Sequence, residues 1–521
     1  MNRSNSWQGL IAVALAAGAA LGQPPAAKFE IADVHPSPPT VNYHQRYTTG
    51  GRLAGDRYDI RRATMLDLIE TAWRVDERTV LGGPSWLDMD RFDIRAKVPA
   101  GTTQQTIQPM LQALLAERFG LVLHNDTRPV PAWALTAGKT PKLKPADGSG
   151  KSGCSAEEPN PADIVFTCHN ETMAMLAMQL QYAPGDYTDE NFVADKTGLT
   201  GAWDFTFKYT PRSVVDDRRV TLLQALEQLG LGLEPATIPM PVIVVDRVNQ
   251  KPTENSPDAD KAFPDSPAEF EAAVIKPSAP GPHQLDAYVG GLDTRVQYLP
   301  GGRVNAQATL HGLIRWIWGR SDPIIAGMPA FADLDSWNIE AKGPDPTADS
   351  EAENRMLTNL LVTRFKLAYH LEERPIMANT LVAVKPKMKK ADPASRTGCK
   401  EGTAAPTKDD PRDANPILGR LLTCQNTTMA QFAYLLFHGM AAGYVGSPVV
   451  DATGLQGGWD FTLSFSAPAL VKGVDAGTSE PNGAIKLQEA MEKQIGIKLE
   501  MQKHPLEVLV IDHLERMPTE N

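Results

Sequence analysis

The sequence predicts an α+β fold in two tandem homologous domains, each built of small strand-helix-strand-strand modules. A motif of twelve residues occurs first at 195–206 and again at 451–462, and nine of its twelve positions are identical. Helical and strand-like hydrophobic periodicities alternate within each half of the chain. No glycine-rich nucleotide-binding turn interrupts them. Together these observations favour a duplicated mixed fold over a single large nucleotide-binding sheet.

Further matches follow in the same order in both halves, which indicates duplication of a whole domain. Arg118-Phe119 matches Arg364-Phe365, and both halves end in Pro-Thr-Glu-Asn, at 252–255 and 518–521. Residues 256–268 between them are rich in Pro, Asp and Ala and are typical of a linker. We therefore expect a first copy over 28–255, a linker over 256–268 and a second copy over 269–521. Each copy is far longer than the repeating unit of a solenoid.

Individual elements of the first copy follow from local periodicity. Helices are expected over 64–73, with Thr64 as the N-cap, and over 102–118, 172–181 and 222–229. Strands are expected over 29–34, 91–98, 121–124, 130–137, 164–168, 203–209 and 242–248. The strand at 203–209 alternates aromatic and polar residues, so Trp203 and its counterpart Trp459 are expected to be core residues, not an exposed ligand platform.

The first residues predict export. Arg3 precedes a short apolar run, and small residues at Ala20 and Gly22 then suit a cleavage site, so residues 1–22 resemble a signal peptide. A membrane anchor is the alternative, but the run is shorter than the roughly 20 residues that a spanning helix needs. No other apolar run reaches that length, so we expect no membrane span in the mature chain. The expected location is periplasmic or extracellular.

The four cysteines fall two to a copy. In an exported chain the economical interpretation is one disulfide within each copy, Cys154 with Cys168 and Cys399 with Cys424. Metal ligation is the alternative, but the nearby His169 is replaced by Gln425 in the second copy. We therefore predict two disulfides and no metal site.

Several motifs together resemble a known family. They are Gly82-Gly83-Pro84-x-Trp86-Leu87 followed by Arg91-Phe92-Asp93-Ile94, then Leu115-x-Glu117-Arg118-Phe119-Gly120-Leu121, the run at 195–206, and the strand at 242–246. The chain resembles the soil-associated family of exported proteins of unknown function that is expanded in acidobacteria. Related domains of that family also occur fused to membrane-embedded metallopeptidase sensors. The resemblance covers both halves and implies a class of protein rather than an activity.

The second copy departs from one of these motifs. The segment 327–331 reads Gly-Met-Pro-Ala-Phe where the first copy has Gly-Pro-Ser-Trp at 83–86. A functional role of Trp86 common to both copies is therefore doubtful.

Motifs for catalysis and cofactor binding are missing. Gly150-Lys151-Ser152 imitates the end of a phosphate-binding loop, but Pro145 stands where its first glycine belongs. The sequence contains no His-Glu-x-x-His zinc motif and no Gly-x-Ser-x-Gly elbow. The net charge is −11, which is unsuited to a general nucleic-acid-binding protein. We therefore predict no catalytic residue, no cofactor and no nucleic-acid partner.

For two features the sequence allows both a functional and a structural interpretation. His124 and His370 occupy matching positions, and Asp126 and Glu372 two residues later would share their strand faces. Catalysis is one interpretation of these pairs, and surface polarity of a strand is the other. Two basic tracts beside the cysteines either meet an anionic envelope polymer or are solvated loops; they comprise Lys139, Lys142, Lys144 and Lys151, and Lys385, Lys387, Lys389 and Lys390.

Two functional hypotheses follow from the sequence. The favoured hypothesis is an exported, non-catalytic binding or sensing protein of the cell envelope, whose partner is an unknown envelope ligand or protein. The alternative is an exported hydrolase that uses His and carboxylates at the cleft between the two domains. The absence of a recognisable nucleophile and base favours the first hypothesis.

Overall fold

The computed structural model describes most of the chain, and all statements below concern that part. The described residues are 28–37, 51–160, 163–185, 187–212, 214, 219–263, 267–278, 294–299, 301–319, 324–345, 350–437, 441, 444–471 and 483–520. The signal peptide predicted over 1–22 lies outside the described residues.

Each copy consists of two lobes with separate hydrophobic cores. In copy one, lobe N1 is an antiparallel sheet in the order β1-β5-β3-β2, covered by helices α1 and α2. The bounds are β1 (Ile31–Pro36), β2 (Arg52–Ala54), β3 (Arg57–Thr64), β5 (Arg91–Lys97), α1 (Met65–Trp73) and α2 (Gln104–Phe119). Thr64 caps α1 as predicted: its hydroxyl accepts from the Asp67 N–H, and the Asp67 carboxylate accepts from the Thr64 N–H in return.

Lobe C1 contains the second core of copy one. Its antiparallel sheet has the order β7-β11-β9-β8, and α3 and α4 pack against it. The bounds are β7 (Lys144–Pro145), β8 (Gly153–Asn160), β9 (Asp163–Glu171), β11 (Trp203–Tyr209), α3 (Met173–Leu180) and α4 (Leu222–Gln228). The strand predicted at 203–209 is confirmed, and Phe205, Phe207 and Tyr209 are buried on one face of it.

A long two-stranded ribbon joins the two lobes. Strands β6 (Val122–Ala137) and β12 (Leu231–Arg247) pair antiparallel along nearly their whole length. In N1 the short strand β4 (Val80–Gly82) adds in parallel to β12, and in C1 the strand β10 (Val193–Asp195) adds in parallel to β6.

The prediction of two separate strands at 121–124 and 130–137 is therefore wrong, since one strand runs through both. Pro129 faces Pro239 in the middle of the ribbon, where only two strands pair and both have open edges. A proline without an N–H is tolerated at such edge positions. Pro129 and Pro239 are thus accommodated within the two continuous strands of the ribbon.

Copy two repeats this architecture element by element. Its sheets have the orders β13-β17-β15-β14, β16-β24-β18-β22 and β19-β23-β21-β20, which match those of copy one. The bounds are β13 (Ala272–Ser278), β14 (Arg295–Leu299), β15 (Arg303–Thr309), β16 (Ile325–Ala326), β17 (Ser336–Lys342), β18 (Ala368–Ala383), β19 (Lys389–Lys390), β20 (Gly398–Glu401), β21 (Arg420–Thr427), β22 (Val449–Asp451), β23 (Trp459–Phe465), β24 (Ile497–His513), α6 (Leu310–Trp318), α7 (Ser350–Arg364), α9 (Met429–Leu435) and α10 (Leu487–Ala490). We call its lobes N2, around β15 and β17, and C2, around β21 and β23. The predicted α+β fold and domain duplication are confirmed.

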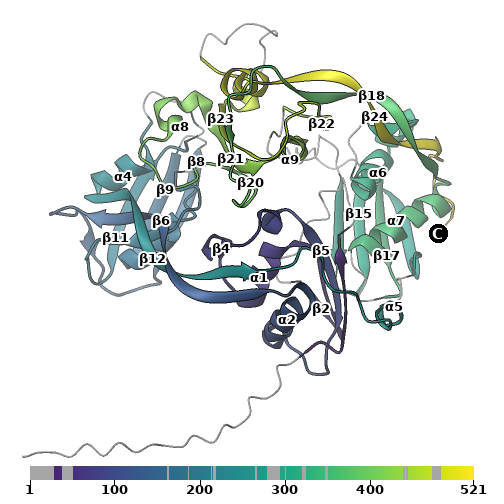
Figure 1. Ribbon diagram of the computed structural model, residues 1–521, viewed down its shortest axis with the longest axis horizontal. Helices are drawn as coiled ribbons and strands as arrows, with labels where there is room; N and C mark the ends of the chain where they lie inside the picture. Colours follow the sequence, from purple (N-terminus) through teal and green to yellow (C-terminus); the bar gives the residue numbers. More distant parts are fainter. Residues whose placement is uncertain are drawn as a thin grey trace, which may run out of the picture.

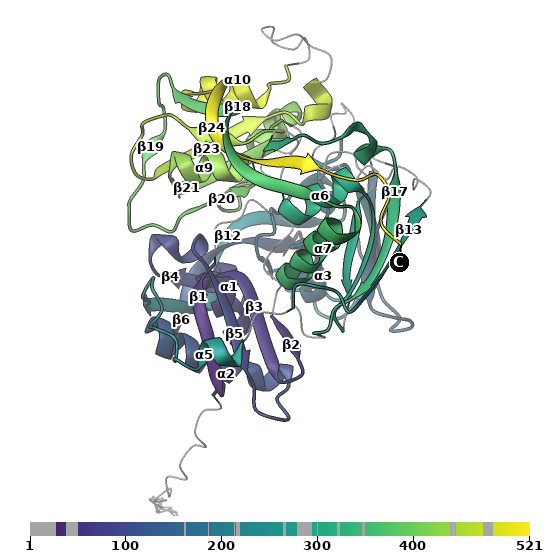
Figure 2. The same cartoon turned by 90° about the vertical axis from the view of Figure 1, so that its right-hand side faces the viewer.

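The four lobes form a ring in which the two ribbons alternate with the C1–C2 and N1–N2 contacts, and N1 also contacts C2 where Asp88 pairs with Arg396 (Figure 1). The ribbon β6–β12 links N1 to C1, and the ribbon β18–β24 links C2 to N2, as Figure 2 also shows from the side. C1 meets C2 through buried ion pairs, and N1 approaches N2 where Arg57 lies 3.5 Å from Asp345. No described helix is long and apolar enough to cross a membrane.

The segment predicted as a linker packs against copy one. Helix α5 (Ala259–Ala262) lies beside β1, and both Ala259 and Phe263 are buried. The guanidinium of Arg95 lies 5.6 Å from the centre of the Phe263 ring, and that of Arg57 lies 5.9 Å from it. These cation–π contacts and the buried ring fix the first part of the connection to lobe N1.

Candidate functional site

Each copy carries one disulfide at the equivalent place. Cys154 on β8 is bonded to Cys168 on β9, and Cys399 on β20 is bonded to Cys424 on β21. In both copies the two cysteines face each other directly across the strand pair. The predicted disulfide pairing is confirmed, and it suits an oxidising compartment.

The segment closed by the disulfide is longer in copy two, and its additional residues contact copy one. The two cysteines are separated by 14 positions in copy one and by 25 in copy two. The longer segment contains helix α8 (Pro411–Ala414) and a turn of 3-10 helix (Pro416–Leu418), which have no described equivalent in copy one. It lies against lobe C1.

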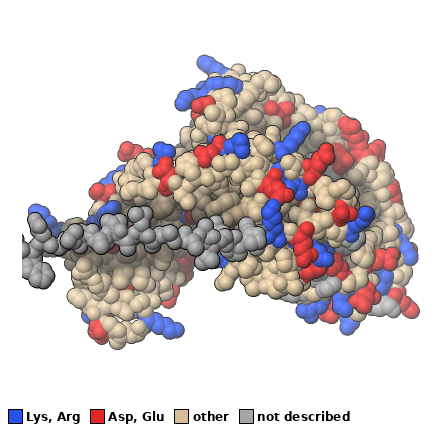
Figure 3. Space-filling model, turned by 60° about the horizontal axis from the view of Figure 1, so that its bottom comes forward, with Lys and Arg blue, Asp and Glu red and all other residues tan. Residues whose placement is uncertain are grey.

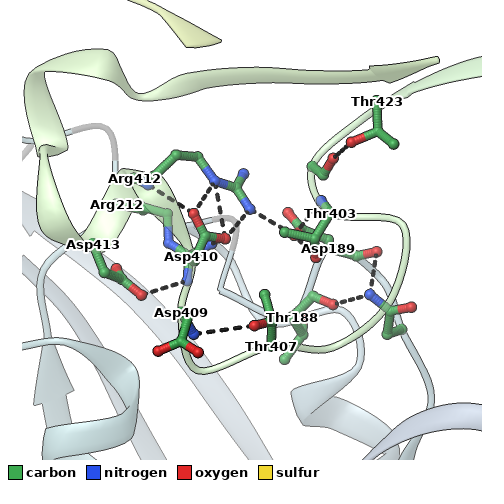
Figure 4. A network of polar contacts seen from close by, with 12 residues as sticks. Thr188, Asp189, Arg212, Thr403, Thr407, Asp409, Asp410, Arg412, Asp413 and Thr423 are labelled. Carbon is green, nitrogen blue, oxygen red and sulfur yellow. Dashed lines mark hydrogen bonds and ion pairs between the residues drawn. The ribbon is translucent and has the colours of Figure 1, made fainter. Parts of the chain in front are cut away.

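Buried charges join this segment to C1 (Figure 4). Arg212 of C1 donates to Asp410 at 2.6 Å, and Arg412 donates to Asp189 of C1, also at 2.6 Å. Arg412 further donates to Asp410 through Nε at 2.9 Å, so the four side chains form one chain of alternating charge. Arg212 is 2% exposed and Arg412 3%. We call these four residues the clamp.

Hydrogen bonds within the clamp favour the charged forms of Arg412 and Asp410. Burial by itself lowers the pKa of Arg412, but the hydrogen bonds to Asp410 and Asp189 outweigh it and raise that pKa above its usual value. Asp189 adopts a left-handed backbone conformation (φ 46°) and also accepts from the N–H and the hydroxyl of Thr403. Neighbouring Gly402 has no room for a side chain, because a Cβ there would lie 2.4 Å from the Asp189 carboxyl carbon. The two copies are therefore fixed at this interface.

A cavity of about 700 Å³ lies between N1 and C2. Its size is within the usual range of small-ligand sites, and such sites favour interfaces between domains. Copy one contributes the end of β1, the β3–β5 edge and residues 250–251, and copy two contributes the start of β20 and the end of α9. We call it the inter-copy pocket. The lining residues used below are Arg62, Asp88, Asp90, Arg91, Phe92, Lys251, Gly398, Cys399, Tyr434 and Leu435.

Contacts between the copies hold the pocket walls together. Arg396 of copy two donates to Asp88 of copy one through Nε at 2.7 Å, and its second guanidinium contact reaches the other Asp88 oxygen. It also donates to the Val80 carbonyl at 2.6 Å. The Thr397 N–H donates to the Ser85 carbonyl at 3.2 Å. The charge of Asp88 is thereby neutralised at the pocket wall.

A β-bulge shapes the copy-one side of the pocket. Ile60 pairs with Ile94 and Ala63 with Phe92, so both Arg61 and Arg62 lie opposite Asp93. Arg62 has a left-handed backbone (φ 55°), which is uncommon for a residue other than glycine. The buried Asp93 carboxylate holds this geometry by accepting from the Arg62 N–H at 2.8 Å and from the Ser37 hydroxyl at 2.6 Å. The bulge turns the Arg62 side chain toward the pocket.

The bulge is specific to copy one. In copy two the equivalent strands pair without a shift, and Gln307 alone lies opposite Asn338. Copy two therefore has one fewer residue here and neutral amides in place of the arginines and Asp93. Arg62, Lys251 and Tyr434 were not singled out from the sequence, and Arg91 was named only as part of a family motif. The signal was present as the extra residue of 57–64 relative to 303–309.

The two histidines singled out from the sequence each pair with an aspartate on the opposite strand. His124 Nδ1 lies 2.8 Å from Asp246 Oδ2, and His370 Nδ1 lies 2.8 Å from Asp512 Oδ2. The partner expected for His124 was Asp126, but that carboxylate pairs with Arg128 at 2.7 Å instead. Glu372 does lie near His370, at 3.5 Å from Nε2. Both histidines are about half exposed, and neither is among the described residues that line the inter-copy pocket.

The two tryptophans singled out from the sequence lie apart from the pocket. Trp203 and Trp459 pack against the cores of C1 and C2, as expected. Both are only half-buried, so the expectation that they are buried was wrong. The Lys390 ammonium lies 4.4 Å from the centre of the Trp459 ring, which explains the open face of that indole. Among the described residues, no group of three or more His, Cys, Asp or Glu side chains is placed to hold a metal ion.

Comparison with known proteins places the chain in a family. The family described as "Protein of unknown function (DUF3738)" matches twice, at residues 66–248 and 311–514, once in each copy. No curated protein and no solved structure matches the chain. The two matched regions cover most of the sequence and run from α1 through β12 in copy one and from α6 through β24 in copy two. The chain belongs to the DUF3738 family, with the family's domain present in two copies.

Proposed function

We propose that this chain is an exported, non-catalytic binding protein of the cell envelope that holds a small ligand in the inter-copy pocket. The observation that carries the proposal is the cavity of about 700 Å³, which neither copy forms alone. Its walls come from β3 and β5 of copy one and from β20 and α9 of copy two. Export is supported by the two disulfides and by the signal-like residues 1–22.

The arrangement of the copies supports binding. The clamp and the Arg396–Asp88 pair fix both copies around the pocket, so little ordering is needed when a ligand enters. Preorganised walls reduce the free-energy cost of binding. A ligand that contacts both copies would in turn stabilise their arrangement, which suits a sensing role.

Blocking the pocket tests this proposal. Gly398 lines the pocket, and a Cβ added there meets no atom within 4 Å, so Gly398→Phe is expected to add a ring at the pocket wall without displacing the backbone. Ser155→Phe adds the same ring at an exposed position of the corresponding strand in copy one and is the control. In a thermal-shift screen of small metabolites, compounds that stabilise the wild type and Ser155→Phe should leave Gly398→Phe unchanged. Compounds that stabilise all three proteins equally would argue against the pocket.

The alternative function is an exported hydrolase using His and carboxylates. The His124–Asp246 and His370–Asp512 pairs favour it, because an aspartate that orients an imidazole is a common part of a general base. Against it, these pairs lie on the two ribbons, and the described lining of the inter-copy pocket contains no histidine. Hydrolysis of ester or amide substrates that is lost in His370→Gln or His124→Gln would favour the hydrolase.

A further inference from the structure

The contact between N1 and C2 is made at defined positions of the repeated fold. In N1 it uses the turn of 3-10 helix Ser85–Asp88 and the residue after it, Met89. In C2 it uses Arg396 in the chain before β20, and Tyr434 and Leu435 on α9. Because the domain is present twice, N2 and C1 carry the same positions. The chain therefore contains a second pair of surfaces of this kind.

N2 exposes an apolar residue at a position that N1 uses for the contact. Its turn of 3-10 helix, like that of N1, begins after a proline and ends at an aspartate, so Asp333 corresponds to Asp88. Leu334 then corresponds to Met89. Met89 is partly buried, whereas Leu334 is 68% exposed. The Asp333 carboxylate lies 2.7 Å from His311 and is still about half exposed. N2 thus presents an apolar side chain beside an accessible carboxylate.

A second exposed apolar side chain lies near Leu334. Arg516 donates to Asp335 at 2.6 Å, which places the segment 516–517 beside the turn. Met517 is 59% exposed and stands where the pocket wall of copy one has Lys251. This exchange makes the surface of N2 more apolar than its counterpart on N1. We call Asp333, Leu334 and Met517 the N2 patch.

C1 carries the complementary charge and a further apolar side chain. Lys151 stands three residues before the first cysteine of copy one, as Arg396 does in copy two. It therefore takes the place of the arginine that pairs with Asp88. Met178 on α3 takes the place of Tyr434 on α9, since both helices begin after a capping threonine, and Met178 is 61% exposed. We call Lys151 and Met178 the C1 patch.

The ring keeps the two patches apart within one chain. C1 and N2 lie on opposite sides of the ring, and N1 and C2 meet between them (Figure 1). The exposure of Leu334, Met517 and Met178 agrees with this arrangement. A contact between the C1 patch and the N2 patch is therefore one between molecules.

We infer that the N2 patch of one chain binds the C1 patch of a second copy of the same chain, which repeats the N1–C2 contact between molecules. Lys151 of one chain pairs with Asp333 of the other, as Arg396 pairs with Asp88. Met178 packs against the apolar residues of the N2 patch, and their removal from water drives association. Because each chain carries both patches, two reciprocal contacts close a symmetric dimer.

The distribution of surface charge suits such a local contact. On the face seen in Figure 3, Lys and Arg are interspersed with Asp and Glu and form no broad field of either sign. Specificity then depends on individual pairs and not on long-range attraction between whole surfaces.

Sedimentation equilibrium of the full chain tests the inference. The wild type should be a dimer that dissociates on dilution. Leu334→Glu and Met178→Glu bury a charge in the contact, and each should weaken dimerisation about tenfold or more. Val384→Glu, at an exposed apolar position just beyond β18 and outside both patches, should leave it unchanged. Equal melting temperatures of the three variants as dilute monomers show that all of them fold.

Reversing the charges shows whether the two patches face each other. Lys151→Glu and Asp333→Lys each juxtapose like charges and should weaken dimerisation about tenfold or more. The chain with both substitutions restores the pair with opposite signs and should dimerise like the wild type. A monomeric wild type would overturn the inference, and so would a dimer insensitive to Leu334→Glu and Met178→Glu. A double variant as weak as the single ones would show that Lys151 and Asp333 do not meet, and would also overturn it.

Discussion

His370 on β18 and Asp512 on β24 form an ion pair, 2.8 Å between Nδ1 and Oδ2, that repeats His124 and Asp246 of copy one. Each aspartate reaches its histidine because both ribbons have the same local irregularity in strand pairing. The strand register shifts between Val245 and Arg247 in copy one, and at the matching place in copy two. In each case the aspartate is the extra residue, and the bulge turns it toward the histidine.

The His370–Asp512 pair predicts a raised histidine pKa. The hydrogen bond to Asp512 is the main cause of that shift above 6.5, and Glu372 adds to it. Because the folded-state pKa is raised, the pair stabilises the fold below the ordinary histidine pKa, and this is lost as pH rises through the folded value. An NMR titration of His370 should show the raised pKa, and Asp512→Asn should lower it. An unchanged pKa in Asp512→Asn would mean that the pair does not form in solution.

The clamp predicts that replacing its buried arginine lowers the free energy of unfolding more than replacing an exposed arginine does. Arg412→Met leaves Asp189 and Asp410 without their common partner, and breaking such a buried pair typically costs about 3–5 kcal/mol. The matched control is Arg128→Met, which breaks an exposed pair with Asp126 and should cost much less than the buried change. Urea unfolding of the three proteins measures both losses. Equal, small losses would show that the interface between C1 and C2 is not tightly formed.

The two disulfides should differ in their effect on the interface between the copies. Replacing Cys399 and Cys424 by Ser removes a cross-link that stabilises by about 3–4 kcal/mol, and it also loosens the segment that carries Asp410 and Arg412. Replacing Cys154 and Cys168 should cost about 3 kcal/mol without reaching the clamp. Hydrogen exchange at residues 402–418 should therefore rise only in the first variant. A similar rise in both would contradict the assignment of the longer segment to the interface.

The buried Glu171 carboxyl group should make the stability of lobe C1 depend on pH. Its side chain is fully buried and accepts one hydrogen bond, from Gln179 at 3.1 Å, and burial raises its pKa. Because the folded-state pKa is raised, the associated stability is fully present below 4.5 and is lost as pH rises through the folded value. Glu171→Gln should therefore raise the melting temperature more at pH 8 than at pH 4, whereas Glu227→Gln, at an exposed position of α4, should not. Equal effects at both pH values would contradict a raised pKa of the buried Glu171 carboxyl group.

Much of the fold could be predicted because its signals are local. The Thr64 cap, the helices at α1 and α3 and the aromatic strand at 203–209 depend on neighbouring residues, and all were predicted. The repeat of 195–206 at 451–462 revealed the duplication without any structural information. The disulfides followed from the placement of two cysteines in each copy.

What could not be predicted depends on residues far apart in the chain. Asp246 meets His124 only because a bulge in one long strand turns it across the ribbon, and Asp126, nearer in sequence, was the natural expectation. Arg212 and Asp410 come from different copies. The inter-copy pocket is likewise a product of how the copies pack, although the extra residue at Arg62 marked one of its walls.

The most direct test of the central claim is hydrogen–deuterium exchange of the full chain with and without a compound that raises its melting temperature. Binding in the inter-copy pocket should slow exchange in both copies at once, at residues 89–92 of copy one and at residues 397–399 of copy two. The same compound should protect neither segment in Gly398→Phe. Protection confined to one copy, or located on the ribbons around His124 and His370, would contradict a ligand site between the copies.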